Sequence, residues 1–355
     1  MHPGLPDLSS LQSLERRSPD PGEGSELIFD LHVHPGAGKF SAEALQRKSL
    51  RRMGRRLGFD TENSGREANF RIIEGEVLRL LEESVIDRAV FLALDAAFRE
   101  DGIRDDARTL MVMDNDEIAD LAAVNVRVLF GAGIHPYRPD ALRELERLVN
   151  RGACLIKWLP SAQNIKPDDP RCFPFYEALA HFGIPLLCHT GNEHTLSVFP
   201  NDFNDPGRLR PALEMGVTVI AAHCGLRLYL HEKSYFHRWR GMTRRHENLY
   251  GDISAFGIIT RIWTLRSMLK SPGLRERLVF GSDFPVAPMP WTCLGCLGLR
   301  AVRYIQGMKN PFDRSVALMK GVGVPDEVFA RGGSLLRLGK NEKSRNRSAV
   351  EETRG

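Results

Sequence analysis

Eight short apolar runs recur along the chain at the spacing of a strand–helix unit. From the third run on, successive runs begin at residues 126, 153, 184, 217, 248 and 277, so the steps are 27 to 33 residues. Most runs are apolar throughout rather than alternating, which is typical of parallel strands buried on both faces. The runs are LIFDLHV (27–33), RAVFLALD (88–95), VRVLFGAGI (126–134), ACLIKWL (153–159), IPLLCHT (184–190), VTVIAAHC (217–224), NLYGDIS (248–254) and RLVFGSD (277–283).

Helical patterns lie between these runs. Three of them are ALRELERLV (141–149), FPFYEALAHF (173–182) and PGRLRPALEM (206–215). Eight strand–helix units close into a barrel, so we predict an α/β fold, a (β/α)₈ TIM barrel. An open doubly wound sheet is the alternative. It is disfavoured because no Gly-x-Gly-x-x-Gly follows the first run and because there are eight runs.

Three segments fall outside the repeat. Residues 1–26 are rich in Pro, Gly and Ser and are expected to be flexible, and the polar residues 341–355 are expected to be disordered. The barrel would then span residues 27–340. A long insertion, residues 35–75, follows the first strand within it.

Charge and composition restrict the class of protein. The 49 Lys and Arg nearly balance the 45 Asp and Glu, with a net charge of +4, and no apolar run approaches the ~20 residues of a membrane span. Neither nucleic acid nor a membrane is therefore expected as a partner. The six cysteines suggest reduced thiols, and residues 1–26 lack the apolar stretch of a signal peptide. We expect a cytoplasmic protein that takes a small-molecule substrate and can form a homo-oligomer.

Five of the runs end on side chains of metal-binding type. The first ends in His32 and His34, which lie two residues apart and so point to the same side of a strand. The other four end in Lys157, His189, His223 and Asp283. Active sites of (β/α)₈ barrels lie at the C-terminal strand ends. Any one of these histidines is most simply a buried structural residue, but their recurrence at one end of the barrel predicts a metal site.

The motifs at these strand ends resemble those of the amidohydrolase superfamily. They are DLHVH, LIKWLP, PLLCHTG, VIAAHCG and FGSDFP, and the resemblance covers about residues 27–340. It is greatest to the branch of metal-dependent TIM-barrel hydrolases, the amidohydrolase-2 branch, that includes decarboxylases and lactonases. The resemblance implies one or two divalent ions per chain, zinc or else manganese or iron. It implies as their ligands His32, His34, Lys157, His189, His223 and Asp283.

Lys157 has two interpretations within this resemblance. An ammonium has no lone pair for a cation, so Lys157 would bind metal as a carbamate that bridges two ions. Otherwise it is a substrate-binding ammonium beside a single metal. Its neighbour Trp158 should point the other way, toward the helices.

The resemblance also implies the catalytic groups. A metal pair lowers the pKa of water, and Asp283 would take the proton of the attacking water and pass it to the leaving group. In the mononuclear members the strand-six histidine, here His223, acts as acid and base. The expected activity is hydrolysis of an ester, lactone or amide-type bond of a small, carboxylated molecule.

Three other functions are alternatives. A mononuclear member of the same branch would decarboxylate an organic acid as a lyase. A TatD-type nuclease is disfavoured because that group has a carboxylate where this chain has Lys157. A barrel without activity that serves only for binding is disfavoured by the intact set of ligands.

Further polar residues are candidates around the site. His135 ends the third run and either lines the substrate pocket or is structural. Glu193 and His194 follow the fifth strand, where they are placed to contact substrate or the groups around it, although polar residues of loops are usually solvated. Asp252 ends the seventh strand, where a carboxylate often orients a ligating histidine.

The insertion carries a basic helical pattern. Arg51, Arg52, Arg55 and Arg56 recur at spacings of three and four, so they share a helix face. They form either a solvated basic helix or oligomer contact, or a clamp for a substrate carboxylate. Because the insertion begins next to His34, it is expected to act as a lid over the catalytic mouth.

Overall fold

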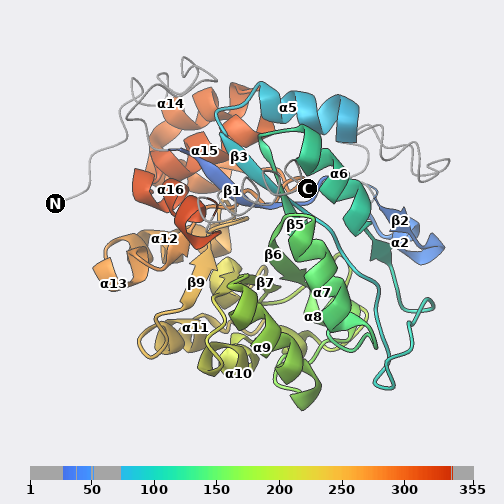
Figure 1. Cartoon of the computed structure of the whole chain (residues 1–355). Coiled ribbons are helices and arrows are strands. Elements are labelled where there is room, and N and C mark those ends of the chain that lie inside the picture. The colour runs from blue at the N-terminus through green and yellow to red at the C-terminus, as the bar shows by residue number, and fades with distance from the viewer. Residues whose placement is uncertain (1–26, 37, 49–50, 52–72, 337, 339–355) are drawn as a thin grey trace, which may run out of the picture.

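Eight parallel strands form a nearly closed barrel (Figure 1). The computed structural model describes residues 27–36, 38–48, 51, 73–336 and 338. In the order of the sheet, the strands are β1 (Phe29–Val33), β3 (Arg88–Leu92), β5 (Val128–Ala132), β6 (Ala153–Trp158), β7 (Leu186–His189), β8 (Val219–Ala222), β9 (Leu249–Asp252) and β10 (Leu278–Val279). Each strand lies within one of the eight predicted runs, and the predicted (β/α)₈ barrel is confirmed.

Backbone bonds between β1 and the segment that follows β10 close the ring. The amide of Leu31 donates to the carbonyl of Phe280 (3.1 Å), and the amide of Asp283 donates to the carbonyl of His32 (2.9 Å). A Cβ at position 281 would lie only 2.7 Å from the Cβ of His32, so Gly281 permits this close approach. The closure therefore brings Asp283 beside His32.

Helices surround the strands (Figure 1). They are α5 (Leu78–Glu82), α6 (Asn115–Val124), α7 (Ala141–Asn150), α8 (Pro160–Gln163), α9 (Phe173–Phe182), α10 (Arg210–Glu214), α11 (Phe236–Thr243), α12 (Ile259–Leu269), α13 (Pro272–Arg275), α14 (Leu294–Gly307), α15 (Pro311–Gly321) and α16 (Asp326–Leu335). The predicted helices at 141–149 and 173–182 are confirmed as α7 and α9. The pattern at 206–215 is divided into the 3₁₀ turn η5 (Pro206–Leu209) and α10, because Pro211 has no N–H to continue the hydrogen-bond series.

The barrel has an inner and an outer hydrophobic core. Leu31, Leu92, Leu155 and Ile220 belong to the inner core, and Leu336, just after α16, joins them. Because α16 packs against β1, this helix helps to close the N-terminal end of the barrel. The active site is therefore expected at the opposite end of the barrel.

Trp158 belongs to the outer core. Its ring lies 5.7 Å from the rings of both Phe175 and Tyr176 of α9, centroid to centroid. The prediction that Trp158 faces the helices is confirmed. Its neighbour Lys157 must then face the inside of the barrel.

The described start of the insertion lies at the mouth of the barrel. Its strand β2 (Lys39–Phe40) pairs with β4 (Met111–Val112), which follows β3. The helix α2 (Ala42–Gln46) comes next, and the guanidinium of Arg47 then donates to the carbonyls of Thr195 and Ser197, both at 3.1 Å, in the loop after β7. Residues 52–72 lie outside the described residues, as do 1–26 and 341–355, so the expectations for these segments stay predictions.

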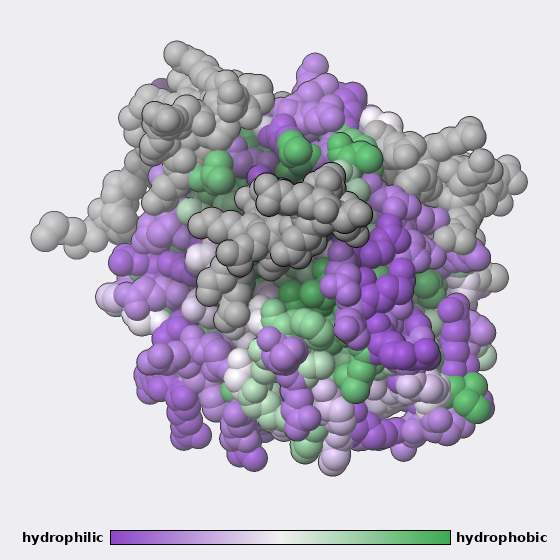
Figure 2. Space-filling view, in the orientation of Figure 1, coloured by the Kyte–Doolittle hydropathy of each residue, from purple (hydrophilic) through white to green (hydrophobic). Residues whose placement is uncertain are grey.

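The outer surface is largely hydrophilic. On the face seen in Figure 2, polar residues cover most of the outer helices, while hydrophobic residues gather toward the centre. Within the described part of the chain, no helix has the length and apolar character needed to span a bilayer.

Candidate metal centre

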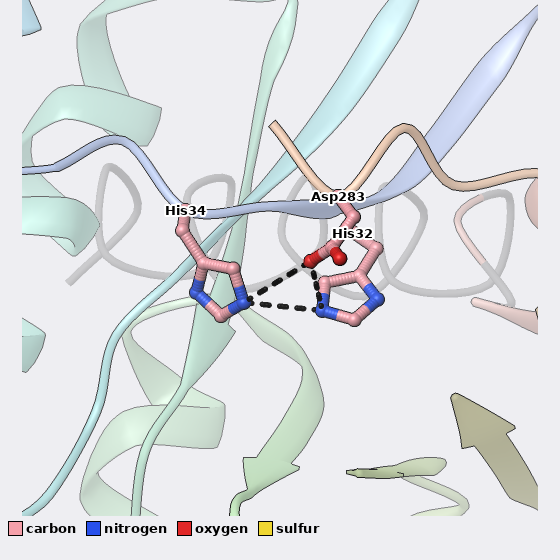
Figure 3. Close-up of side chains that lie close together, drawn as sticks. All are labelled: His32, His34 and Asp283. Carbon is pink, nitrogen blue, oxygen red and sulfur yellow. Dashed lines mark hydrogen bonds and ion pairs between the residues drawn. The ribbon is translucent and has the colours of Figure 1, made fainter. Parts of the chain in front are cut away.

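His32, His34 and Asp283 converge at the mouth of the barrel (Figure 3). One ligand atom of each residue lies within 4.8 Å of the others. The two Nε2 atoms are 3.1 Å apart, and Asp283 Oδ1 lies 3.4 Å from that of His32 and 3.8 Å from that of His34. Two imidazole nitrogens and a carboxylate oxygen form a donor set suited to zinc, manganese or iron. These three residues can therefore hold a divalent ion.

A buried carboxylate orients His32. Asp252 Oδ2 lies 2.7 Å from His32 Nδ1, and the other carboxylate oxygen accepts hydrogen bonds from the His223 amide (2.8 Å) and from Ser254 Oγ (2.5 Å). Because a carboxylate accepts, the proton of His32 belongs on Nδ1, and Nε2 presents its lone pair to the other ligands. This is the arrangement expected of Asp252 from its place in the sequence.

The histidines of the site are held neutral. Burial lowers the pKa of His32, His34 and His223 well below the ordinary value, and it lowers the pKa of His189 to about 4. Neutral imidazole is the form that binds metal. Within the described residues, His189 Nε2 is buried and has no hydrogen-bond partner. A ligating nitrogen would have this environment before its metal binds.

His189 and His223 border the three-residue group without belonging to it. Their rings lie 5.0 Å apart, and the His223 ring stacks on His32 at 5.6 Å. His223 Nδ1 is 3.0 Å from the Ser254 carbonyl, to which it can donate, while Nε2 faces Asp283 Oδ2 at 3.9 Å. His223 thus presents an unprotonated nitrogen beside Asp283.

The backbone is strained at both predicted catalytic residues. His223 has φ 60° and Asp283 has φ 61°, and Cys224 follows with φ 53°. Residues other than glycine rarely adopt this left-handed conformation, and such strain clusters at functional sites. Nothing in the sequence indicates it.

Lys157 lies against the metal-binding nitrogen of His32. Its Nζ is 2.8 Å from His32 Nε2, and the side chain is completely buried. Burial lowers the pKa of Lys157, and Asp283 and Asp252 oppose this effect. Burial raises the pKa of Asp283 to about 8, although the charge of Lys157 acts to lower it. An ammonium in this place would repel a divalent ion.

His135 is held by backbone groups in this geometry. Its ring is fully buried, with Nε2 2.7 Å from the Gln163 carbonyl and Nδ1 accepting from the Tyr137 amide at 3.1 Å. The backbone thus occupies both ring nitrogens. No hydrogen-bonding nitrogen of the ring is left over, and substrate contact by His135 stays a prediction.

Glu193 and His194 occupy different places. Glu193 Oε2 lies 3.7 Å from His189 Nε2, so this carboxylate adjoins the site. His194 is 38% exposed and pairs with Glu232 at 2.5 Å, joining the loop after β7 to the loop after β8. Substrate contact by either residue stays a prediction.

Two charged residues near the site were not expected from the sequence. Arg261, in the first turn of α12, is 3% exposed, and its guanidinium donates to the carbonyls of Arg227 (3.3 Å) and Leu226 (3.4 Å). Burial lowers its pKa, whereas Asp283 and Asp252 raise it. Asp30 is fully buried below the site, and burial raises its pKa to about 7. In the sequence Arg261 looks like any other arginine of a helix, so no pattern distinguishes it. Asp30, by contrast, belongs to the DLHVH motif, which is a signal that could have pointed to it.

Comparisons with known proteins agree with this architecture. A TIM-barrel protein from Bordetella bronchiseptica is 17% identical with a TM-score of 0.53, over 83% of this chain and 96% of that one. A protein described as a 2-pyrone-4,6-dicarboxylic acid hydrolase from Pseudomonas putida is 13% identical (TM-score 0.53; 88% and 98% covered). A 2,6-dihydroxybenzoate decarboxylase from Rhizobium is 15% identical (TM-score 0.50; 89% and 100% covered). At these identities the likeness shows the fold alone.

The family comparison covers most of the barrel. No curated protein matches the chain. The sequence family described as amidohydrolase matches residues 30–302, which contain all three residues of the metal-binding group. The chain therefore belongs to the amidohydrolase family, in its amidohydrolase-2 branch.

Proposed function

We propose that the protein is a metal-dependent hydrolase that cleaves an ester, lactone or amide-type bond of a small carboxylated molecule. The observation that carries this proposal is the convergence of His32, His34 and Asp283, with their ligand atoms within 4.8 Å of one another at the mouth of the barrel. A bound divalent ion would lower the pKa of water and polarise the carbonyl under attack.

The protein's own groups would move the proton. Asp283 lies between the two ligating histidines and His223, so its carboxylate can accept a proton from the attacking water. If the site holds a single ion, His223 Nε2, which faces Asp283 at 3.9 Å, can exchange that proton and deliver it to the leaving group; with two ions this nitrogen is a ligand and Asp283 carries the proton. Ser254 fixes the His223 ring for this role through its carbonyl and hydroxyl.

Lys157 is proposed to be carboxylated. Because burial lowers its pKa, the neutral amine, which is the form that adds CO₂, is more populated than at the surface. Carbamate formation joins CO₂ to Nζ with release of a proton, and it replaces a cation with an anion. Together with His189 and His223, the carbamate would provide ligands for a second ion. If Lys157 stays unmodified, it serves as a cation for substrate beside a single ion.

Arg261 supports a carboxylated substrate. It is a buried guanidinium near Asp283, and of its five N–H donors the two described bonds to carbonyls leave capacity for a carboxylate. Of the arginines first expected to form the clamp, Arg51 is exposed, and Arg52, Arg55 and Arg56 lie outside the described residues. The two similar enzymes from Pseudomonas putida and Rhizobium are named for carboxylated compounds.

Decarboxylation is the second candidate. The group of three ligands makes a single metal site, and it leaves His189, His223 and Lys157 available to deliver the proton that replaces CO₂. A decarboxylase is also among the structures with this fold.

One experiment distinguishes the two reactions. Metal-depleted protein and protein reloaded with Zn²⁺, Mn²⁺ or Fe²⁺ would be incubated in H₂¹⁸O with carboxylated lactones, esters, amides and aromatic acids. Hydrolysis places ¹⁸O in the product, whereas decarboxylation releases CO₂ and leaves the residual product unlabelled. Arg261→Met should raise KM for carboxylated substrates and leave their methyl esters unaffected. Turnover that is equal with and without metal would refute the metal-dependent mechanism.

A further inference from the structure

Large hydrophobic side chains are exposed together on one side of the barrel mouth. We call this group the apolar rim. It comprises Leu230 (72% exposed), Ile259 (60%), Trp263 (54%), Met289 (46%), Trp291 (51%) and Leu294 (43%). They come from the loops that follow β8 and β10 and from the start of α12 and α14. Isolated exposed hydrophobic residues are common, but six in neighbouring segments are not.

Contacts between these segments make the rim continuous. The Trp263 ring lies 3.6 Å from the position of a Cβ on Gly295, the residue next to Leu294. Thr292 Oγ1 donates to the Gly257 carbonyl at 2.6 Å, which holds the loop of Met289 and Trp291 against the loop that leads to α12. Thr260 Oγ1 donates to the Leu228 carbonyl at 2.9 Å and so places the loop of Leu230 beside Ile259.

The rim has the size and composition of an interface. With on the order of 150–250 Å² for each large side chain when fully exposed, the six residues present roughly 600 Å². A standard interface buries about 800 Å² per partner, of which somewhat more than half is apolar. Tryptophan and methionine are enriched in interfaces, and tryptophan is prominent among the residues that dominate binding energy.

We propose that the apolar rim is the contact surface between two copies of this chain related by a two-fold axis. In such a contact the same surface meets itself, and the six members of the rim carry no charge. The guanidinium of Arg266, which lies 5.7 Å from the centre of the Trp263 ring, borders the rim on α12. The apolar area on one copy nearly suffices for a standard interface. The rim therefore needs no partner of different chemistry to be covered.

Dimer formation would support the active site. The helix α12 carries Ile259 and Trp263 on its exposed face and Arg261 on its buried face. Met289 and Trp291 lie six and eight residues after Asp283 in the chain. Packing of a second copy on the rim would thus hold the segments that position Arg261 and Asp283. This inference does not depend on which reaction the site performs.

Mass measurements of full-length protein test the proposal. Light scattering with size exclusion should give close to twice the chain mass of 39.9 kDa at tens of micromolar protein. Trp263→Glu and Trp291→Glu should each raise the dimer dissociation constant at least ~30-fold, as at an interface hot spot. Val124→Glu, at an 84% exposed hydrophobic residue that ends α6, is the matched control and should leave the dimer intact.

Fluorescence of unmodified protein gives a second measurement that requires no variant to fold. Of the four tryptophans, Trp158 and Trp239 are fully buried, so the accessible emission comes from Trp263 and Trp291 of the rim. Acrylamide quenching should increase when the protein is diluted from dimer to monomer. Three outcomes would each overturn the proposal. The wild-type protein could be monomeric at ~100 µM, the dimer could survive both rim substitutions, or a monomer could bind to lipid vesicles.

Discussion

Asp252→Asn should weaken metal binding although it removes no ligand. The carboxylate bonds to His32 Nδ1 through Oδ2 at 2.7 Å, while Oδ1 accepts from the His223 amide and from Ser254. In the variant the side-chain oxygen must stay with the His223 and Ser254 donors, so the side-chain NH₂ group takes the place of Oδ2. Two donors then meet at His32 Nδ1. The ring can relieve this conflict only by moving its proton to Nε2, the nitrogen that faces the metal position.

The expected loss follows from this change of tautomer. Removal of a partner that orients a ligating histidine typically lowers metal affinity 10–100-fold, or about 1.4–2.7 kcal/mol. We expect the upper end of this range, because the substitution also opposes the ligating tautomer. The Asp252 side chain is fully buried, so water cannot replace the lost acceptor.

Competition titration against a chromophoric chelator would measure the affinity for Zn²⁺ in wild-type and variant protein. Asp205→Asn is a suitable control, because Asp205 is also buried but bonds to Gly207 and Arg238, outside the metal-binding group. Its metal affinity should equal that of the wild type. An Asp252→Asn protein that is folded by circular dichroism and binds zinc within twofold of the wild type would refute the orienting role.

Three other predictions address the site and its support. Asp283→Asn should retain most of the metal and lower turnover by about 10²–10⁴, and full activity would remove Asp283 from the mechanism. Lys157→Ala should lose one equivalent of metal by elemental analysis, with partial rescue by a short carboxylic acid; full retention of metal with only a raised KM would favour the ammonium. Burial lowers the pKa of His135 from 6.5 to about 3, so the unfolded chain binds a proton below pH 6.5 that the folded chain does not. His135 thus makes its full contribution to the free energy of unfolding above pH 6.5. This contribution is lost as the pH falls toward 3, by about 1.4 kcal/mol per pH unit. Urea unfolding of His135→Gln should show a shallower acid dependence, and parallel curves would contradict this.

The sequence by itself determined the barrel and the ends of its strands. Apolar runs at intervals of 27 to 33 residues place a buried strand in each unit, and hydrophobic burial depends on the local pattern rather than on distant partners. Because parallel strands of a barrel end at the same face, His32, His34 and Asp283 could be assigned to one site before their distances were known.

Tertiary structure decided the chemical state of each group. The strand-end position of Asp252 predicted that it orients a ligating histidine, but only the folded barrel shows that this histidine is His32, 220 residues away, and that the bond selects its tautomer. Only the folded chain shows that Arg261 is buried near the site and that backbone partners occupy both ring nitrogens of His135. A residue type and a strand end can be predicted from short-range periodicity. Hydrogen-bond partners, burial and pKa depend on distances between segments that meet only when the barrel closes.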